Sequence, residues 1–452
     1  MERAGVAGDA EIVVLNTCTV TEGADKDARA SIRRLQRVNP DCRILVTGCY
    51  AQRAPAELAA LPGVTWVVGN SHKHQAAEIA TASSSLGFVP LTQISGEGHL
   101  STADIIVGDI FAHTELLAAP VFDAANERTR PNLKVQDGCD NRCSFCVIPY
   151  VRGQSRSLPM ERVLAEVRTL VDAGYREIVI SGINLGRWGR DLDSHQSSVV
   201  SHQLKHTTSD LRLEALIRAI LRETSLEKLR ISSVEPMDWS DELIGLVASS
   251  PRIAKHAHVP MQSGSDGVLR RMHRKYRPWH YREKILKIRA AMPTAAIGAD
   301  VMVGFPGETA TEFDETRCMV EELPFTYLHV FTYSARPGTP AAERPDQVPV
   351  NIARERNHVL RDIASKKKAA FMRSLMGTVV EAITLQSGGA GFSEGLTENY
   401  LKLKIAGRHE ANRWMAVTID GTDGEMLIGN SATGGDRKAE VDGRSTRPAI
   451  AC

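Results

Sequence analysis

Three cysteines in the middle of the chain have the spacing that most directly indicates chemistry. Cys139, Cys143 and Cys146 stand in the segment Gln136-Asp-Gly-Cys-Asp-Asn-Arg-Cys-Ser-Phe-Cys-Val-Ile-Pro149, directly after an expected strand. A cubane iron–sulfur cluster normally takes four thiolates, one for each iron, so three neighbouring cysteines leave one iron open to an outside ligand. The amino and carboxylate groups of S-adenosylmethionine can fill such a position. The spacing therefore predicts a four-iron cluster that binds this cofactor.

A structural zinc site is the alternative for the same loop, and it needs four Cys or His ligands close together. Cys and His are absent between Cys146 and His195, and the nearest upstream is His113. The supply of ligands thus favours the cluster over zinc. Further along, His202 and His206 have a spacing that would place them on one helix face. Since no partner ligand accompanies them, we expect a surface insertion there rather than a metal site.

The composition of the chain excludes several classes of protein. Its 452 residues are 42% hydrophobic and 24% charged, with a formal net charge of +1, as in an ordinary protein of two or three domains. The apolar stretches are far shorter than the roughly 18 residues of a membrane helix, and the amino terminus lacks a secretory signal. We expect no membrane span and a cytoplasmic location. In that reducing compartment, eight cysteines indicate metal or redox chemistry rather than disulfides.

Strand-like and helix-like segments alternate in the first part of the chain. Short apolar runs that suit strands are separated by stretches whose apolar residues recur at helical spacing. We therefore expect an α/β domain over residues 1–108, ending in a connection rich in Ser, Gly and Thr. The expected strands are 11–15, 43–47 and 65–68, and the expected helices are 24–38 and 55–61.

Six strand-like runs follow, and helix-like text comes after each of them except the last. Six such β/α units favour a parallel, barrel-like sheet, which we expect to form a domain over residues 125–350. The runs are 133–136, 177–181, 228–232, 256–261, 297–303 and 327–333.

The last part of the chain predicts a small β domain. A charged, helix-like stretch at 351–375 leads into strand-like text at 378–385 and 400–405. We place this β domain at residues 370–430. Residues 431–452 are rich in Gly, Asp, Arg and Ser without apolar periodicity, so we expect a disordered tail.

Two further motifs extend the interpretation from a cofactor to a family. The texts Asn16-Thr-Cys-Thr-Val-Thr21 and Gly48-Cys-Tyr-Ala-Gln52 are similar to those of the radical S-adenosylmethionine methylthiotransferases that modify threonylcarbamoyladenosine beside the anticodon of tRNA. Nearly the whole chain resembles this family. The resemblance implies an amino-terminal cluster domain, here incomplete, a central open (β/α)6 radical-SAM barrel, and a small carboxy-terminal β-barrel TRAM domain that binds RNA.

The resemblance also implies which residues contact S-adenosylmethionine. The motifs that carry them stand at the ends of expected strands, where parallel β/α barrels bind their ligands. Each of these residues also has a structural alternative; for example, Gly182 could serve only a tight turn and Glu235 could simply pair with a basic neighbour. The implied contacts are Phe145, Gly182, Ser233, Glu235 and Gln262.

A second four-iron cluster is implied in the amino-terminal domain, where the family supplies three cysteines. Cys18 and Cys49 match the second and third of them, whereas the first belongs to a strand ahead of everything in this sequence. We therefore expect the chain to begin downstream of the true start; two cysteines plus an exogenous ligand are the alternative. Cys42 precedes the strand that ends before Cys49, so the two lie on the order of 20 Å apart and cannot share a cluster.

In the family, an electron from the reduced cluster cleaves S-adenosylmethionine, and the resulting radical removes hydrogen from carbon 2 of the modified adenosine, where a methylthio group is installed. The implied partners are the tRNA anticodon loop and an electron donor such as flavodoxin or ferredoxin. Two alternatives stay open: methylthiolation of a ribosomal protein, and an inactive fragment that only binds RNA.

Local features of the sequence favour contact with RNA. The segments 266–289 and 352–374 are rich in Lys and Arg and could bind phosphates; a solvated helix face is the alternative, but the β domain that follows favours RNA contact. Tyr276, Trp279 and Tyr281 could stack on bases, or they could be buried.

Overall fold

The computed structural model describes residues 9–82, 103–112, 116, 129–192, 212–389 and 391–432. The chain divides into two compact units, Met1–Phe371 and Met372–Cys452. The insertion around His202 and His206 and the expected tail from residue 433 onward lie outside the described residues. None of the described helices is long and apolar enough to cross a membrane.

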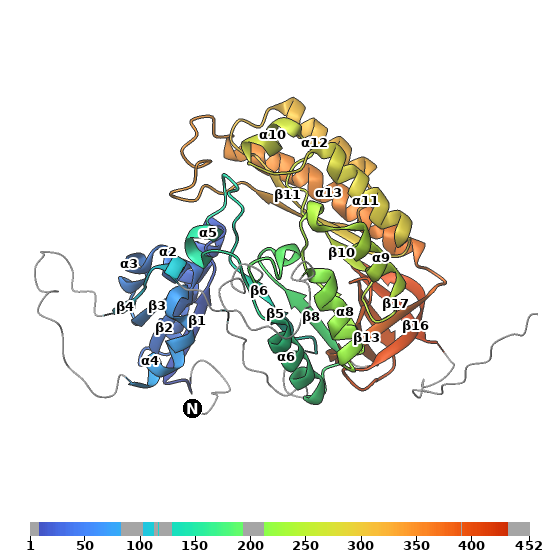
Figure 1. Cartoon of the computed structure of the whole chain (residues 1–452), viewed down its shortest axis with the longest axis horizontal. Coiled ribbons are helices and arrows are strands. Elements are labelled where there is room, and N and C mark those ends of the chain that lie inside the picture. Colours follow the sequence, from blue (N-terminus) through green and yellow to red (C-terminus); the bar gives the residue numbers. More distant parts are fainter. Residues whose placement is uncertain are drawn as a thin grey trace, which may run out of the picture. The chain divides into compact units, whose positions relative to one another are not determined.

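The first unit begins with a parallel four-stranded sheet in the order β1-β2-β3-β4, drawn in blue and cyan in Figure 1. Helix α1 covers it with Ala28 and Ile32 buried, and the Thr21 hydroxyl caps the helix by accepting a hydrogen bond from the Ala24 amide. This confirms the expected α/β patterning. The strands are β1 (Ile12–Thr17), β2 (Arg43–Gly48), β3 (Val64–Gly69) and β4 (Asp104–Ile106), and the helices are α1 (Glu22–Val38), α2 (Cys49–Arg53), α3 (Pro55–Ala59) and α4 (Ala76–Ala82).

Six parallel strands form the centre of the same unit. Two three-stranded sheets, β5-β8-β9 and β10-β11-β12, are joined by parallel bridges such as Ser233–His258, which gives one open sheet of six strands. All six expected strands are present, and each end differs from its expected position by three residues or fewer. The strands are β5 (Asn132–Lys134), β8 (Glu177–Ser181), β9 (Lys228–Ile231), β10 (His256–His258), β11 (Ala296–Val303) and β12 (Tyr327–Thr332).

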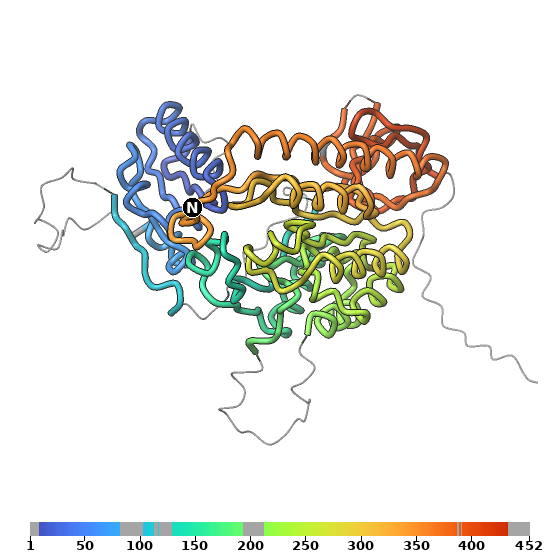
Figure 2. The backbone as a smooth tube through the Cα atoms, turned by 90° about the horizontal axis from the view of Figure 1, so that it is seen from above, coloured from blue at the N-terminus to red at the C-terminus, as the bar shows by residue number. Residues whose placement is uncertain are grey.

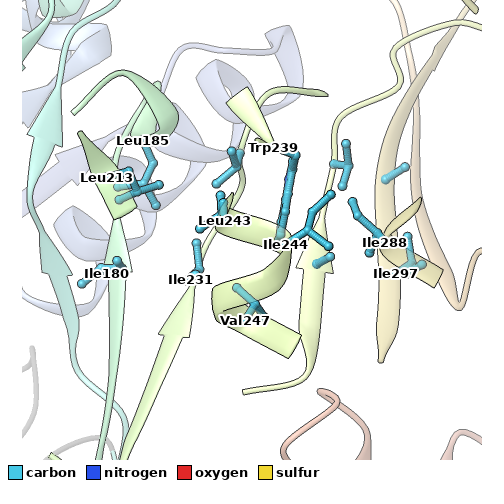
Figure 3. Packing of buried hydrophobic residues seen from close by; sticks show 14 of the residues in the cluster. Ile180, Leu185, Leu213, Ile231, Trp239, Leu243, Ile244, Val247, Ile288 and Ile297 are labelled. Carbon is cyan, nitrogen blue, oxygen red and sulfur yellow. The ribbon is translucent and has the colours of Figure 1, made fainter. Parts of the chain in front are cut away.

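Helices cover the outer face of this sheet, as expected for β/α units. Figure 3 shows side chains of helix α9 packed among others that include Ile231 of β9. They are Leu243, Ile244 and Val247, together with Trp239 just before the helix. These residues form one continuous apolar core. A short hairpin of β6 (Gln136–Asp137) and β7 (Arg156–Ser157) flanks the cysteine loop, and the helices are α5 (Ile148–Arg152), α6 (Met160–Asp172), α8 (Leu213–Glu223), α9 (Asp241–Ser249), α10 (Asp266–Arg271), α11 (Pro278–Ala291) and α12 (Ala310–Glu322).

Helix α13 (Val350–Ser374) leads from the barrel to the second unit and runs as one continuous helix in Figure 2. The second unit is a closed five-stranded barrel in the order β13-β14-β15-β17-β16. This confirms the expected small β-barrel. Its strands are β13 (Val379–Gly389), β14 (Phe392–Thr397), β15 (Lys402–Ala406), β16 (Trp414–Asp423) and β17 (Met426–Ser431).

Candidate active site

The cysteine loop lies between strand β6 and helix α5. Gly138 opens it with φ +70°, and a Cβ there would lie 1.9 Å from the Gln154 carbonyl oxygen, so the turn requires glycine. The loop is held at both ends, because the Cys139 amide donates to the Gly153 carbonyl at 3.1 Å and the Ser144 amide donates to the Met272 carbonyl at 3.1 Å. The backbone thus fixes the loop over the ends of the barrel strands.

One cavity of about 480 Å³ joins this loop to the ends of the strands. Each of the three loop cysteines lines it, and so does each residue that the family resemblance implies for S-adenosylmethionine. The residues predicted from the sequence therefore lie around one cavity in the folded chain. They are Cys139, Cys143, Cys146, Phe145, Gly182, Ser233, Glu235 and Gln262.

The spacing of the three thiols distinguishes a cluster from a single ion. Among the described residues, no three Cys, His, Asp or Glu side chains converge closely enough to share one metal ion. In a cubane each thiolate binds its own iron, so its ligands stand further apart around a volume such as this cavity provides. The residues present therefore fit a four-iron cluster better than zinc.

Burial changes the pKa of two of the loop thiols and thereby indicates what the site can bind. Burial raises the pKa of Cys139, and it raises the pKa of Cys146 to about 12. A thiol with so high a pKa is protonated near neutral pH, and only a bound cation makes its thiolate stable there. The cavity wall carries one such compensating charge, since Arg274 lies with Nη1 3.5 Å from the Cys143 sulfur.

Of the structural alternatives for Gly182 and Glu235, only the one for Glu235 is confirmed. A Cβ at Gly182 would lie 2.8 Å from Oε1 of the buried Gln136, so close packing rather than a tight turn requires the glycine. Glu235 does pair with a basic neighbour, because Arg274 donates a hydrogen bond to its carboxylate. Both residues nevertheless line the cavity.

Three further residues of the cavity wall escaped sequence reasoning. Asn184 follows β8, and its Oδ1 is buried without a hydrogen-bond partner among the described residues. Asp300 lies on β11, where its carbonyl accepts hydrogen bonds from the Met261 and Gln262 amides. Arg274 is buried although it stands in a basic stretch. Positions at strand ends were a usable signal for Asn184, but nothing in the sequence separates Arg274 from its basic neighbours.

Cys18 and Cys49 follow the paired ends of neighbouring strands, since β1 and β2 run parallel with Thr17 opposite Gly48. Cys49 is 3% exposed, and its sulfur accepts a hydrogen bond from Arg152 Nε at 3.0 Å. Cys18 is exposed. The fold thus brings together the two cysteines that the family resemblance implies for a second cluster.

Cys42 lies elsewhere, as the sequence predicted. It comes just before β2, whereas Cys49 comes just after it, so the whole strand separates them. Cys42 is buried in the apolar core between the first sheet and helix α1, next to residues such as Ile32. Cys49 instead packs with Val147, near the cysteine loop of the barrel.

The segment after Cys18 reaches the barrel cavity. Val20 and Thr21 line the same cavity as the three loop cysteines. This segment is anchored by Arg336, whose Nη1 donates to the Thr19 carbonyl at 3.2 Å and to Asp25 Oδ2 at 2.7 Å. The amino-terminal sheet and the barrel therefore contribute to one site.

Most basic residues of the stretch 266–289 form ion pairs with acidic residues of the same chain. For example, Arg271 pairs with Glu312, and Arg282 pairs with Glu322. Of the three aromatic residues for which stacking and burial were alternatives, Tyr276 and Tyr281 are buried, with hydroxyls that donate to backbone carbonyls, whereas Trp279 is 56% exposed. For the two tyrosines burial was the correct alternative, because both side chains fill the barrel core.

Comparison with known proteins matches the chain in two places. Residues 133–318 match the Radical SAM superfamily, and residues 1–69 match the family described as Uncharacterized protein family UPF0004. One similar solved structure is the radical S-adenosylmethionine methyltransferase TsrM from Kitasatospora setae with tryptophan substrate and a SAM analogue bound. It has a TM-score of 0.50 and 16% identity, and the match covers 84% of this chain and 69% of that one, which shows the fold alone.

Curated relatives match over most of the chain. The threonylcarbamoyladenosine tRNA methylthiotransferase MtaB of Bacillus subtilis is 38% identical over 90% of this chain and 85% of its own length. The protein of the same name in Aquifex aeolicus is 34% identical over 91% of each chain. The tRNA-2-methylthio-N(6)-dimethylallyladenosine synthase of Cereibacter sphaeroides is also 34% identical, over 85% of this chain and 80% of its own.

Proposed function

Because the chain belongs to the radical S-adenosylmethionine methylthiotransferase family of the threonylcarbamoyladenosine type, we propose that it adds a methylthio group to carbon 2 of N6-threonylcarbamoyladenosine in tRNA. The observation that carries this proposal is the single cavity lined by the three loop cysteines and by the segment that follows Cys18. A radical enzyme that also inserts sulfur needs these two groups of residues at one place.

In this proposal Cys139, Cys143 and Cys146 hold the radical cluster. When bound, the cluster and S-adenosylmethionine supply one-electron chemistry that can remove a hydrogen atom from a carbon. The protein leaves one iron without a side-chain ligand and keeps the thiols in a low-exposure loop. Arg274 lies beside Cys143 and pairs with Glu235, so one buried cation serves both the cluster loop and the cofactor wall.

Four of the cofactor contacts follow three barrel strands, β8, β9 and β10, and the fifth, Phe145, belongs to the cysteine loop. Phe145 packs edge-on against Phe305, with ring centroids 6.3 Å apart, which fixes an apolar side of the cavity. Ser233 and Gln262 follow β9 and β10 and add polar side chains to the lining of the same cavity. We assign S-adenosylmethionine to this cavity, because its polar and apolar side chains suit an amino acid and a nucleoside.

We assign the second cluster to Cys18 and Cys49. Around Cys49 the chain provides one cation and one amide: Arg152 donates to its sulfur at 3.0 Å, and Asn70 Nδ2 lies 3.6 Å from it. These donors stabilise a thiolate, as a metal ligand requires. The role of this site in the reaction is to present the sulfur that replaces the hydrogen at carbon 2.

RNA contact is assigned to helix α13 and to the carboxy-terminal barrel. On α13, Arg354 and Arg361 are exposed and form no ion pair within the part of the chain that the structure describes, so they are available to phosphates. We propose the domain limits 1–108, 125–350 and 370–430 for the three parts. The anticodon loop is the expected RNA target, and flavodoxin or ferredoxin the expected electron donor.

Anaerobic reconstitution tests the proposal directly. The full chain, loaded with iron and sulfide, is incubated with S-adenosylmethionine, a reductant and anticodon stem–loops that carry threonylcarbamoyladenosine, dimethylallyladenosine or plain adenosine. We expect nucleoside mass spectrometry to show methylthiolation of the first RNA. An iron content of about eight per chain indicates both clusters, and about four indicates one. Product only from the dimethylallyl RNA, or from none, would refute the proposed function.

A further inference from the structure

Two hydroxyl groups on the cavity wall are arranged as hydrogen-bond donors. Thr21 and Ser334 both line the cavity, although they come from the amino-terminal segment and from the end of strand β12. Thr21 Oγ1 accepts a hydrogen bond from the Ala24 amide at 3.2 Å, and Ser334 Oγ accepts one from the Glu22 amide at 3.0 Å. The backbone of helix α1 therefore occupies an acceptor position on each hydroxyl.

Each of these two hydroxyls can still donate a hydrogen bond. A hydroxyl carries one O–H donor, and neither Thr21 nor Ser334 donates to any residue in the described part of the chain. Both side chains are half-buried at the cavity, so this donor capacity is available to an acceptor bound there. Thr332, which also lines the cavity, adds a third hydroxyl to this wall.

Buried charge behind this wall favours an acceptor that is also an anion. Arg336 and Arg53 share the carboxylate of Asp25, with N–O distances of 2.7 and 3.1 Å, so two cations face one anion. The side chains of Arg336 and Asp25 are only 5% and 4% exposed, which limits screening by water. Glu57 approaches Arg53 to 3.9 Å, but its side chain is 54% exposed and compensates less.

The proposed substrate carries a carboxylate on its N6 substituent, close to the carbon that reacts. In adenine, carbon 2 and the carbon that bears N6 are both bonded to ring nitrogen N1, so the N6 substituent lies next to the reacting carbon. A cavity that takes carbon 2 must therefore also take that substituent. The threonylcarbamoyl group ends in a carboxylate, whereas a dimethylallyl group has neither charge nor acceptor.

We propose that the hydroxyls of Thr21 and Ser334 bind the carboxylate of the N6-threonylcarbamoyl group and thereby select this adenosine. The inference rests on the proposed function and assigns the residues that determine its specificity. Arg336 and Arg53 act indirectly, because they hold Thr19 by its carbonyl and its hydroxyl and carry two positive charges around the one buried carboxylate of Asp25.

The decisive variant is Thr21→Asp. Asp is as good a helix cap as Thr, so α1 keeps its first turn, but its carboxylate faces the substrate carboxylate. The reconstituted full chain is titrated with fluorescent anticodon stem–loops carrying threonylcarbamoyladenosine or plain adenosine. We expect wild type to prefer the modified RNA, and Thr21→Asp to bind it about tenfold to hundredfold more weakly. Ser334→Ala, which only removes a donor, should lose about tenfold.

Two further variants separate this effect from general electrostatics. Lys26→Gln changes the net charge by the same one unit near the start of the same helix, but Lys26 is 64% exposed and pairs with Glu22, and neither residue lines the cavity. It should change affinity by no more than about twofold. Thr21→Ser keeps the hydroxyl, so this variant should prefer the modified RNA as wild type does.

Each outcome decides the inference. If Thr21→Asp and Ser334→Ala bind the modified RNA as tightly as wild type, or lose plain RNA by the same factor, the hydroxyls contact something other than the carboxylate and the inference is overturned. If wild type methylthiolates threonylcarbamoyladenosine without preferring it in binding, the inference fails while the proposed function stands. If wild type neither prefers nor converts that RNA, both fail.

Discussion

Replacement of Gln262 by glycine should make the chain more stable and its cofactor site weaker. Gln262 follows β10 with φ +62°, a left-handed conformation, and its Oε1 is buried without a hydrogen-bond partner in the described residues. The backbone is locked there, because its amide donates to the Asp300 carbonyl and its carbonyl accepts from the Met302 amide, both at 2.8 Å. Such strain at a binding residue is expected where function requires the side chain.

The magnitude follows from four contributions at Gln262. Relief of the left-handed conformation is worth about 1–2 kcal/mol, and removal of an unsatisfied buried acceptor about 1–3 kcal/mol. Against these stand about 0.5–1 kcal/mol for the greater freedom of unfolded glycine and about 1.6 kcal/mol for two buried methylenes. The central values leave Gln262→Gly about 1 kcal/mol more stable than wild type.

Thermal unfolding of the cluster-free chain measures this gain, which should raise the midpoint by about 2 °C. Loss of a polar contact should meanwhile weaken S-adenosylmethionine binding to the reconstituted protein by about tenfold, as read by equilibrium dialysis. Gln262→Ala isolates the strain, because it removes the acceptor but keeps a side chain at positive φ. A glycine variant that is less stable than wild type, or that binds the cofactor equally well, would refute this reasoning.

Three other substitutions test the rest of the site. Arg336→Met should lower the free energy of unfolding by about 2 kcal/mol in denaturant titrations, because Asp25 keeps only Arg53 as a partner; a loss below about 0.5 kcal/mol contradicts the anchor. Cys143→Ser should lower the iron content by about four per chain after reconstitution, and unchanged iron would remove Cys143 from the ligands. Cys42→Ala should cost about 1 kcal/mol of stability and no iron; loss of iron would make Cys42 a ligand.

The cysteine loop and the barrel were predictable because their signals are local. Cys139, Cys143 and Cys146 are close in sequence, so a short loop must bring them close in space. The apolar runs of the six strands are flanked by helices of regular periodicity, and a parallel sheet follows from that alternation. Gly182 and Glu235 were found through motifs at strand ends, where a parallel barrel always gathers its ligands.

Contacts between distant segments could not be predicted from the sequence. Arg274 resembles its basic neighbours in every local property, and only tertiary packing buries it against Glu235. Tyr276 could equally have been a surface aromatic, since its hydroxyl suits both water and the buried carbonyl of Met261 that it binds. The pair Asp25–Arg336 joins residues 311 positions apart, a separation at which no periodicity carries information.

The segment from Cys18 to Thr21 connects the two halves of the proposed reaction. Cys18 is assigned to the cluster that presents sulfur, and Thr21, three residues later, is assigned to the substrate carboxylate. The Thr19 between them is held through its carbonyl by Arg336 and through its hydroxyl by Arg53, which anchors the short segment that joins the two positions. Recognition of the N6 group by Thr21 therefore places the neighbouring carbon 2 at a fixed position relative to the sulfur-bearing site. A substrate without the carboxylate would bind the same cavity without this alignment.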